Sequence, residues 1–160
     1  MKEIYLDHQF FRKLLNKQNL QNGIKMQKQL INPRSRKEKH YDPFHFSAAV
    51  RVGNMIWVSG CVGENLETGV LEPSMEKQAR QAFENIKEVL NAAGAKMSDI
   101  VEIITFHTDQ RGEIAEFMSV KDEYLPENYP AWTSIGVSQL ARPEFKIEIR
   151  VVAVIGCGDK

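Results

Sequence analysis

The sequence has little of what marks metal sites, secreted folds or membrane spans. Its two cysteines, Cys61 and Cys157, stand far apart and form no C-x-x-C pair, so neither a zinc site nor a disulfide framework is predicted. The four histidines form no H-E-x-x-H pattern, and Gly-rich phosphate loops are absent. No apolar run approaches the roughly 20 residues that cross a bilayer, and the first residues lack the order of a secretory signal. We therefore expect a cytoplasmic protein with reduced thiols, no metal and no membrane partner.

The formal net charge is zero, but the charges are unevenly distributed. Residues 1–40 hold 10 Lys or Arg and 3 acids, a net charge of +7, whereas residues 41–160 hold 11 (21 − 10) and 18 (21 − 3), a net charge of −7. We interpret residues 1–40 as a basic N-terminal extension and residues 41–160 as one domain. Binding of nucleic acid through the extension is the alternative. It is disfavoured because the domain lacks interleaved basic and aromatic residues.

The extension has two parts that differ in their sequence pattern. Its first part has five apolar residues at near-helical spacing, which predicts an amphipathic helix over about residues 3–20: Ile4, Phe10, Phe11, Leu14 and Leu15. From Met26 onward, MQKQLINPRS resembles a second beginning. Either Met26 is the natural start, or the first 25 residues form an arm that packs on a neighbouring subunit.

The domain has the alternating signals of strands and helices. The runs AVRV and MIWVSG meet at Gly53-Asn54, which predicts a tight hairpin. A helix is predicted between Ser74, a good N-cap, and Gly94, a good residue for a left-handed C-terminal turn. Residues 100–107 predict a strand, residues 114–125 a second helix after a loop at Arg111-Gly112, and residues 132–137 and 146–155 two further strands.

The last strand predicts how the sheet is covered. Ile147, Ile149 and Val151 share one face of it and should pack under the helices, whereas Glu148 and Arg150 point to the opposite face. A small sheet with helices on one side exposes its other side unless a partner covers it. The pattern therefore indicates an oligomer.

Three blocks of the sequence together resemble the RidA (YjgF) family over about residues 44–155. They are SAAVRVGNMIWVSG, then QARQAFENIKEVLNAAGAKMSDIVEIITFHTD, then YPAWTSIGVSQLARPEFKIEIRVVAV. The resemblance implies an α+β, chorismate-mutase-like fold: a six-stranded mixed sheet with two helices on one face, assembled as a homotrimeric barrel with small-molecule clefts between subunits. It also implies hydrolysis of reactive 2-imino or enamine acids to the keto acid and ammonia, without a cofactor.

The resemblance also implies site residues, with one departure from the family pattern. Where active members carry P-A-R-S/T, this chain has Pro130-Ala131-Trp132-Thr133, so Trp132 replaces the arginine that grips the substrate carboxylate. An indole offers a single neutral N–H in place of a bidentate cation. The resemblance makes Glu148 the catalytic residue that handles water. It makes the following residues candidates for substrate binding: Phe46, Ser59, Gly60, Cys61, Trp132, Ser134 and, as a relocated cation, Arg150.

Three functions stay open from the sequence. The first is a cofactor-free deaminase or hydrolase of imines, enamines or related small metabolites, with ordinary 2-imino acids disfavoured by Trp132. The second is a non-catalytic trimer that binds a small metabolite, or a chaperone-like protein. The feature that separates these two is whether Arg150 or Arg142 faces the cleft near Glu148. The third is nucleic-acid binding through the extension, which predicts an affinity that falls steeply with salt.

Overall fold

The central hairpin forms where the sequence predicts it. In the computed structural model, which describes residues 27–158, β2 (Ala49–Val52) and β3 (Met55–Val62) pair in antiparallel fashion through a turn at Gly53 and Asn54. Gly53 has a φ of 59°, a conformation that costs a glycine little. The predicted amphipathic helix of residues 3–20 and the start at Met26 lie outside the described residues.

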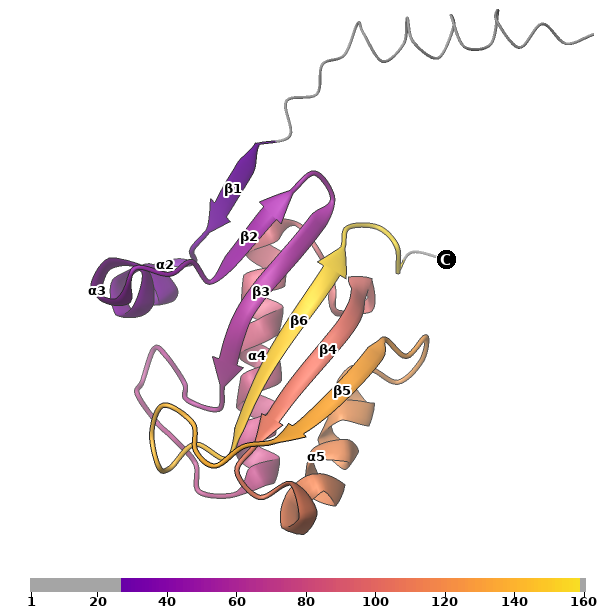
Figure 1. Ribbon diagram of the computed structural model, residues 1–160. Helices are drawn as coiled ribbons and strands as arrows, with labels where there is room; N and C mark the ends of the chain where they lie inside the picture. The colour runs from indigo at the N-terminus through magenta and orange to yellow at the C-terminus, as the bar shows by residue number, and fades with distance from the viewer. Residues whose placement is uncertain (1–26, 159–160) are drawn as a thin grey trace, which may run out of the picture.

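Six strands form one mixed sheet in the order β1-β2-β3-β6-β4-β5 (Figure 1). The remaining strands are β1 (Lys28–Ile31), β4 (Ile100–His107), β5 (Ala131–Gly136) and β6 (Ile147–Val154). Strands β4 and β5 run parallel, and the other neighbouring pairs are antiparallel. The α+β class and the mixed six-stranded sheet are therefore confirmed. Strand β1 lies within the residues that we interpreted as a basic extension.

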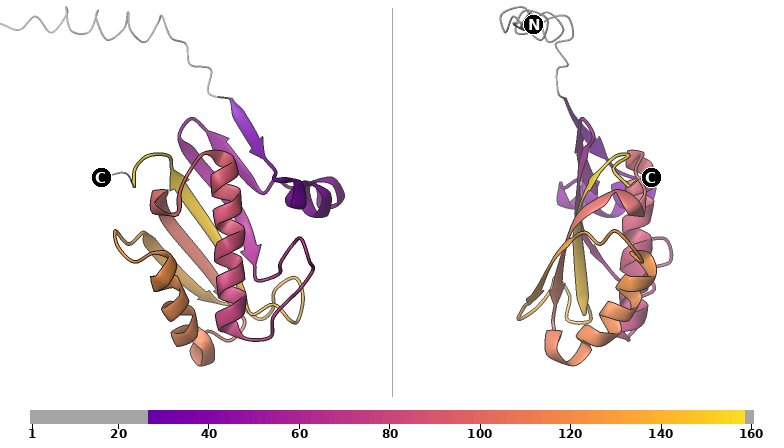
Figure 2. Two further views of the ribbon diagram at one scale, coloured as in Figure 1. Left: turned by 180° about the vertical axis from the view of Figure 1, so that it is seen from behind. Right: turned by 90° about the vertical axis from the view of Figure 1, so that its right-hand side faces the viewer.

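Two helices cover one face of this sheet (Figure 2). Helix α4 (Met75–Ala93) begins at Ser74, whose hydroxyl accepts from the Lys77 N–H, and ends at Gly94 with a φ of 83°, as predicted. Helix α5 (Gln110–Tyr124) begins at Asp109, whose carboxylate accepts from the Gly112 N–H at 3.0 Å. The prediction of a loop at Arg111-Gly112 was wrong, because this cap starts the helix one turn earlier.

The core lies between the helices and the sheet, as the alternation in the last strand predicted. Ile147, Ile149 and Val151 of β6 are buried against α4, together with Phe83 of that helix and Phe117 of α5. The opposite face of the sheet carries no helix of the described chain, as the edge-on view shows (Figure 2). We call it the bare face. No described helix is long and apolar enough to cross a membrane.

A short helical segment lies beside the edge of the hairpin (Figure 1). It comprises α2 (Arg34–Arg36), the π-helical turn η1 (Lys37–Tyr41) and α3 (Asp42–Phe44), and we call it the edge segment. The Asn32 side chain that precedes it accepts from the Ala48 N–H at 2.9 Å. A 3-10 turn, η2 (Met97–Asp99), joins α4 to β4.

One buried side chain fixes the start of β6 to helix α4. The amide of Gln78 donates to the carbonyls of Glu72 (2.8 Å) and Glu144 (2.9 Å) and accepts from the Lys146 N–H (2.9 Å). Gln78 is fully buried, so these three backbone groups have no easy replacement partner. The contact holds the chain just before Glu148.

We expect Gln78→Leu to lower the free energy of unfolding by about 2 to 4 kcal/mol, because it leaves buried backbone groups unpaired. Urea denaturation followed by circular dichroism measures the change. Gln81→Leu is the matched control: this half-buried side chain donates to Asn85 at 3.0 Å, so we expect a loss below about 1 kcal/mol. Equal losses in the two variants would contradict the role given to Gln78.

Candidate functional site

The register of the sheet separates the predicted site residues into two groups. Glu148 and Arg150 alternate with buried Ile147, Ile149 and Val151, so their side chains lie on the bare face. Trp132 pairs through Ile103 with Val151, which places Trp132, and Ser134 two residues on, on the helix face. Within one chain, therefore, these four residues do not share a pocket.

Glu148 lies directly against Gly60. A Cβ on Gly60 would come within 1.8 Å of the Glu148 Oε1, so the missing side chain makes the space for the carboxylate. The pairing of β3 with β6 shifts register between Val58 and Cys61, and such β-bulges re-aim side chains beside active sites. Burial raises the pKa of the half-buried Glu148 carboxyl above its ordinary value of 4.5.

Ser59 and Cys61 flank Gly60 on β3, whereas Phe46 precedes β2. The Ser59 hydroxyl donates to the Ser47 carbonyl at 2.8 Å, and the Ser59 N–H donates to the Ala48 carbonyl at 2.9 Å. Cys61 is buried, and burial raises the pKa of its thiol. Phe46 is 41% exposed, and its ring stacks on that of His40 with centroids 5.3 Å apart.

Trp132 is engaged inside its own subunit. Its indole N–H donates to the Thr105 hydroxyl at 3.0 Å, and its ring packs 5.8 Å from that of Phe117. The Lys121 ammonium lies 5.3 Å from the centroid of the indole ring. The Ser134 hydroxyl likewise accepts from Gln110 at 2.9 Å. Both side chains are half-buried and use their polar atoms within the fold.

The two cations proposed from the sequence differ in their surroundings. Arg142 pairs with Glu64 (3.1 Å) and Glu144 (3.5 Å), so its charge is already used. Arg150 is exposed on the bare face, opposite Ile104 of β4. Arg150 therefore lies on the face of Glu148, two residues along the same strand.

His107 lies inside the core and contacts structural residues. It is fully buried, its Nε2 lies 2.9 Å from the Thr105 hydroxyl, and its ring meets the edge of Phe117. Burial lowers the pKa of His107, which favours the neutral imidazole. Among residues 27–158, no three His, Cys, Asp or Glu side chains gather as metal ligands would.

Two residues near the site were missed from the sequence. Arg36 donates to the Cys61 Sγ at 3.6 Å, and His40 stacks on Phe46, so the edge segment touches two predicted site residues. Arg36 is one of the ten Lys or Arg of residues 1–40, and nothing in the sequence distinguishes it from the others. Its burial, at 3% exposure, distinguishes it only once the fold is known.

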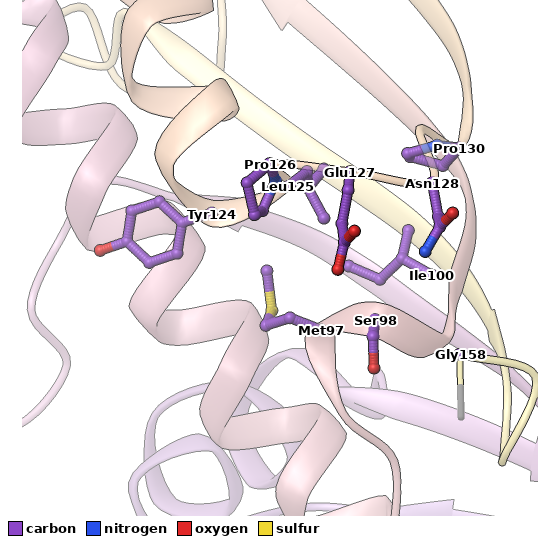
Figure 3. Close-up of a pocket in the computed structure, with 10 residues that line it drawn as sticks. All are labelled: Met97, Ser98, Ile100, Tyr124, Leu125, Pro126, Glu127, Asn128, Pro130 and Gly158. Atoms are coloured by element: carbon purple, nitrogen blue, oxygen red, sulfur yellow. The ribbon is translucent and has the colours of Figure 1, made fainter. Parts of the chain in front are cut away.

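A separate hollow lies at another end of the sheet. It has a volume of about 330 Å³ and is bounded by η2, the loop after α5 and the last residues of the described chain (Figure 3). Met97, Tyr124 and Pro130 are among its lining residues, and none of the site residues predicted from the sequence lines it.

Comparison with known proteins identifies relatives over most of the domain. The model of a family described as Endoribonuclease L-PSP matches residues 40–155. The RutC family protein YjgH of Escherichia coli is 41% identical over 116 residues, which cover 72% of this chain and 86% of YjgH. A protein of Dermatophagoides farinae named 2-iminobutanoate/2-iminopropanoate deaminase is 34% identical over 114 residues, 69% of this chain and 85% of that protein.

Solved structures agree with these relatives. A structure of protein YjgH matches with a TM-score of 0.71 and 38% identity, over 80% of this chain and 96% of that chain.

The raised pKa of Glu148 predicts a pH-dependent effect on stability. A carboxyl whose pKa is raised by folding stabilises the fold while protonated, below about pH 4.5, and loses that contribution as pH rises through its folded pKa. We therefore expect Glu148→Gln to unfold at a higher temperature than wild type at pH 7, and expect the difference to shrink below pH 4.5. Thermal unfolding between pH 4 and 8 measures it.

The matched control is Glu102→Gln, which removes a half-buried carboxylate from the same face without touching Gly60. An equal gain in this variant would contradict the assignment of the effect to the Glu148–Gly60 contact.

Proposed function

This chain belongs to the Endoribonuclease L-PSP family of YjgF and RidA proteins, and on that basis we propose that it hydrolyses small imines or enamines in clefts between subunits. Relatives named 2-iminobutanoate/2-iminopropanoate deaminase support the reaction class. The single observation that carries the proposal is Glu148, held in the space left by Gly60 with a raised pKa. A carboxylate in such a place is suited to proton transfer.

The reaction needs only water and a group that moves protons. Starting from a protonated imine, Glu148 accepts a proton from water while the water oxygen bonds to the imine carbon and the C=N π electrons move to nitrogen. The carboxyl then returns this proton to the nitrogen of the carbinolamine. The C–N bond breaks, nitrogen leaves with the bonding electrons as ammonia, and the hydroxyl oxygen forms the C=O bond and gives its proton to Glu148.

The bare face supports assembly into a trimer of the chorismate-mutase-like kind. A row of register partners crosses this face from β1 to β6 through Leu30, Val50, Trp57 and Val152. Further apolar residues lie beside it, including Ile104 and the 38%-exposed Ile135. A second and third copy would cover this surface, and a cleft between copies could combine Glu148 of one subunit with the Trp132 and Ser134 face of another.

The choice of substrate follows from Trp132. The family arginine would bind a carboxylate beside the imine carbon with two charge-assisted bonds, whereas the indole N–H here already donates to Thr105. Ordinary 2-imino acids should therefore bind poorly. The same observation supports a second candidate function, the binding of a small metabolite without turnover.

The acidic character of the domain argues against a role on nucleic acid. Residues 41–160 carry a net charge of −7, and polyanions are bound mainly through positive charge. The description of the family as an endoribonuclease thus has less support in this chain than hydrolysis of a small molecule.

We expect a solution mass of three times 18.3 kDa, because the bare face must be covered. Sedimentation equilibrium or light scattering at micromolar concentration measures the mass. Trp57→Asp, which places a charge on the bare face, and Arg150→Asp, which reverses one there, should lower the mass. A mass of 18.3 kDa for the wild type would contradict the assembly and the shared clefts together.

We expect ammonia release from small imines that an amine oxidase generates in situ, and little release from 2-iminopropanoate because Trp132 replaces the arginine. Glu148→Gln should lower the rate roughly 10²- to 10⁴-fold, the usual contribution of general acid–base catalysis. Glu102→Gln, on the same face, should keep the wild-type rate. Turnover of 2-iminopropanoate like that of an arginine-bearing relative would refute the substrate argument, and an unchanged rate in Glu148→Gln would refute the mechanism.

A further inference from the structure

Arg36 is a buried cation that lacks a carboxylate partner among residues 27–158. It is 3% exposed, and one of its N–H groups donates to the Cys61 Sγ at 3.6 Å. Its Nε is buried and has no hydrogen-bond partner. Taking a guanidinium out of water costs several kcal/mol unless an anion compensates it. The buried guanidinium of Arg36 therefore requires an anion to compensate its charge.

The groups around Arg36 do not neutralise it. Burial raises the pKa of the Cys61 thiol, which outweighs the opposite influence of the Arg36 charge and keeps the sulfur protonated. Neither nearby carboxylate forms an ion pair with Arg36: that of Glu88 accepts from the Ser35 hydroxyl at 2.9 Å, and that of Glu64 pairs with Arg142 at 3.1 Å.

A second unpaired nitrogen lies on the same segment. His40 follows Arg36 by four residues, and its Nδ1 is buried without a partner. The two residues are close enough for the charge of Arg36 to lower the pKa of His40, after the larger effect of burial. Arg36 directly precedes the π-helical turn η1 and His40 lies within it, and such turns are often found at functional sites. A single anion could accept from both side chains.

Arg36 and Glu148 approach one stretch of β3 from its two sides. Pairing of β2 with β3 ends at Val58, so β3 continues beyond its neighbour. Arg36 meets Cys61 there, whose partner Ile149 belongs to the core, and Glu148 meets Gly60 on the bare face. The Ser59 N–H still donates to the Ala48 carbonyl, but beyond Ser59 no strand of residues 27–158 pairs with this edge of β3.

We propose that Arg36, assisted by His40, binds the carboxylate of a substrate whose reacting carbon lies near Glu148. This inference rests on the proposed function and names its substrate class. The two groups contact β3 from opposite faces, so a ligand that reaches both must extend around the edge of that strand. The acid group of the substrate is therefore several bonds from the C=N carbon, as in an imine of a 4-oxo or 5-oxo acid, and not adjacent to it.

Binding of stable oxo acids tests the proposal by isothermal titration calorimetry with the full chain. We expect 4-oxopentanoate and 5-oxohexanoate to bind at least about 10-fold more tightly than pyruvate. Arg36→Met should weaken their binding about 30-fold or more, the cost of losing one partner of a buried ion pair. Because the charge that it removes is uncompensated, Arg36→Met should fold at least as stably as wild type.

The matched control is Arg34→Met, because Arg34 is an exposed arginine of the same turn that pairs with Glu38. It should bind both oxo acids like wild type. Arg36→Lys keeps the charge but loses the bidentate N–H donors of the guanidinium, so its affinity for the oxo acids should be intermediate. If Arg36→Met does not fold, the affinity of Arg36→Lys tests the proposal.

Three results would overturn the assignment: tighter binding of pyruvate than of the longer acids, no binding of any oxo acid, or equal loss in the Arg34 and Arg36 variants. Binding that depends on Arg36, without ammonia release from any imine, would support this anion site and refute the proposed hydrolysis. Ammonia release that depends on Glu148 but is unchanged in Arg36→Met would support the proposed hydrolysis and refute this anion site.

Discussion

The alternation of side chains along β6 determines most of this molecule. Ile147, Ile149 and Val151 are buried under the helices, and this burial fixes which way every neighbouring strand faces. Glu148 and Arg150 must then point to the side that no helix covers. A shift of one residue would bury both charges and expose the core. The same pattern that builds the core therefore also sets the place of the candidate catalytic carboxylate.

Much of the fold could be predicted from the sequence because its signals are local. The Gly53 turn, the Ser74 cap and the Gly94 terminus each depend on backbone chemistry within a few residues, and each was predicted correctly. Strand β1 was not. Its four residues, KQLI, lie in a basic stretch and become a strand only by pairing with β2. Such a short edge strand depends on its neighbour more than on its own sequence.

The candidate site was predicted less completely, because its parts lie on two faces of the sheet. Counting residues along β6 correctly placed Glu148 and Arg150 on the face opposite the core, but it did not predict the contact of Glu148 with Gly60. It gave no warning that Trp132 packs against Phe117 on the opposite face. The direction of a side chain on an edge strand follows from the register of the whole sheet, and no single sequence motif determines that register.

The same geometry bears on the loss of the arginine at position 132 and on the presence of Arg36. An arginine at position 132 would extend from the helix face, where Lys121 and Phe117 now enclose the indole. Arg36 is instead buried beside Cys61, where a positive charge is costly unless it binds an anion. Replacing Arg36 with an apolar residue should cost the isolated fold little. Its presence is therefore better explained by a ligand than by stability, and that ligand must carry its acid group to the far side of β3.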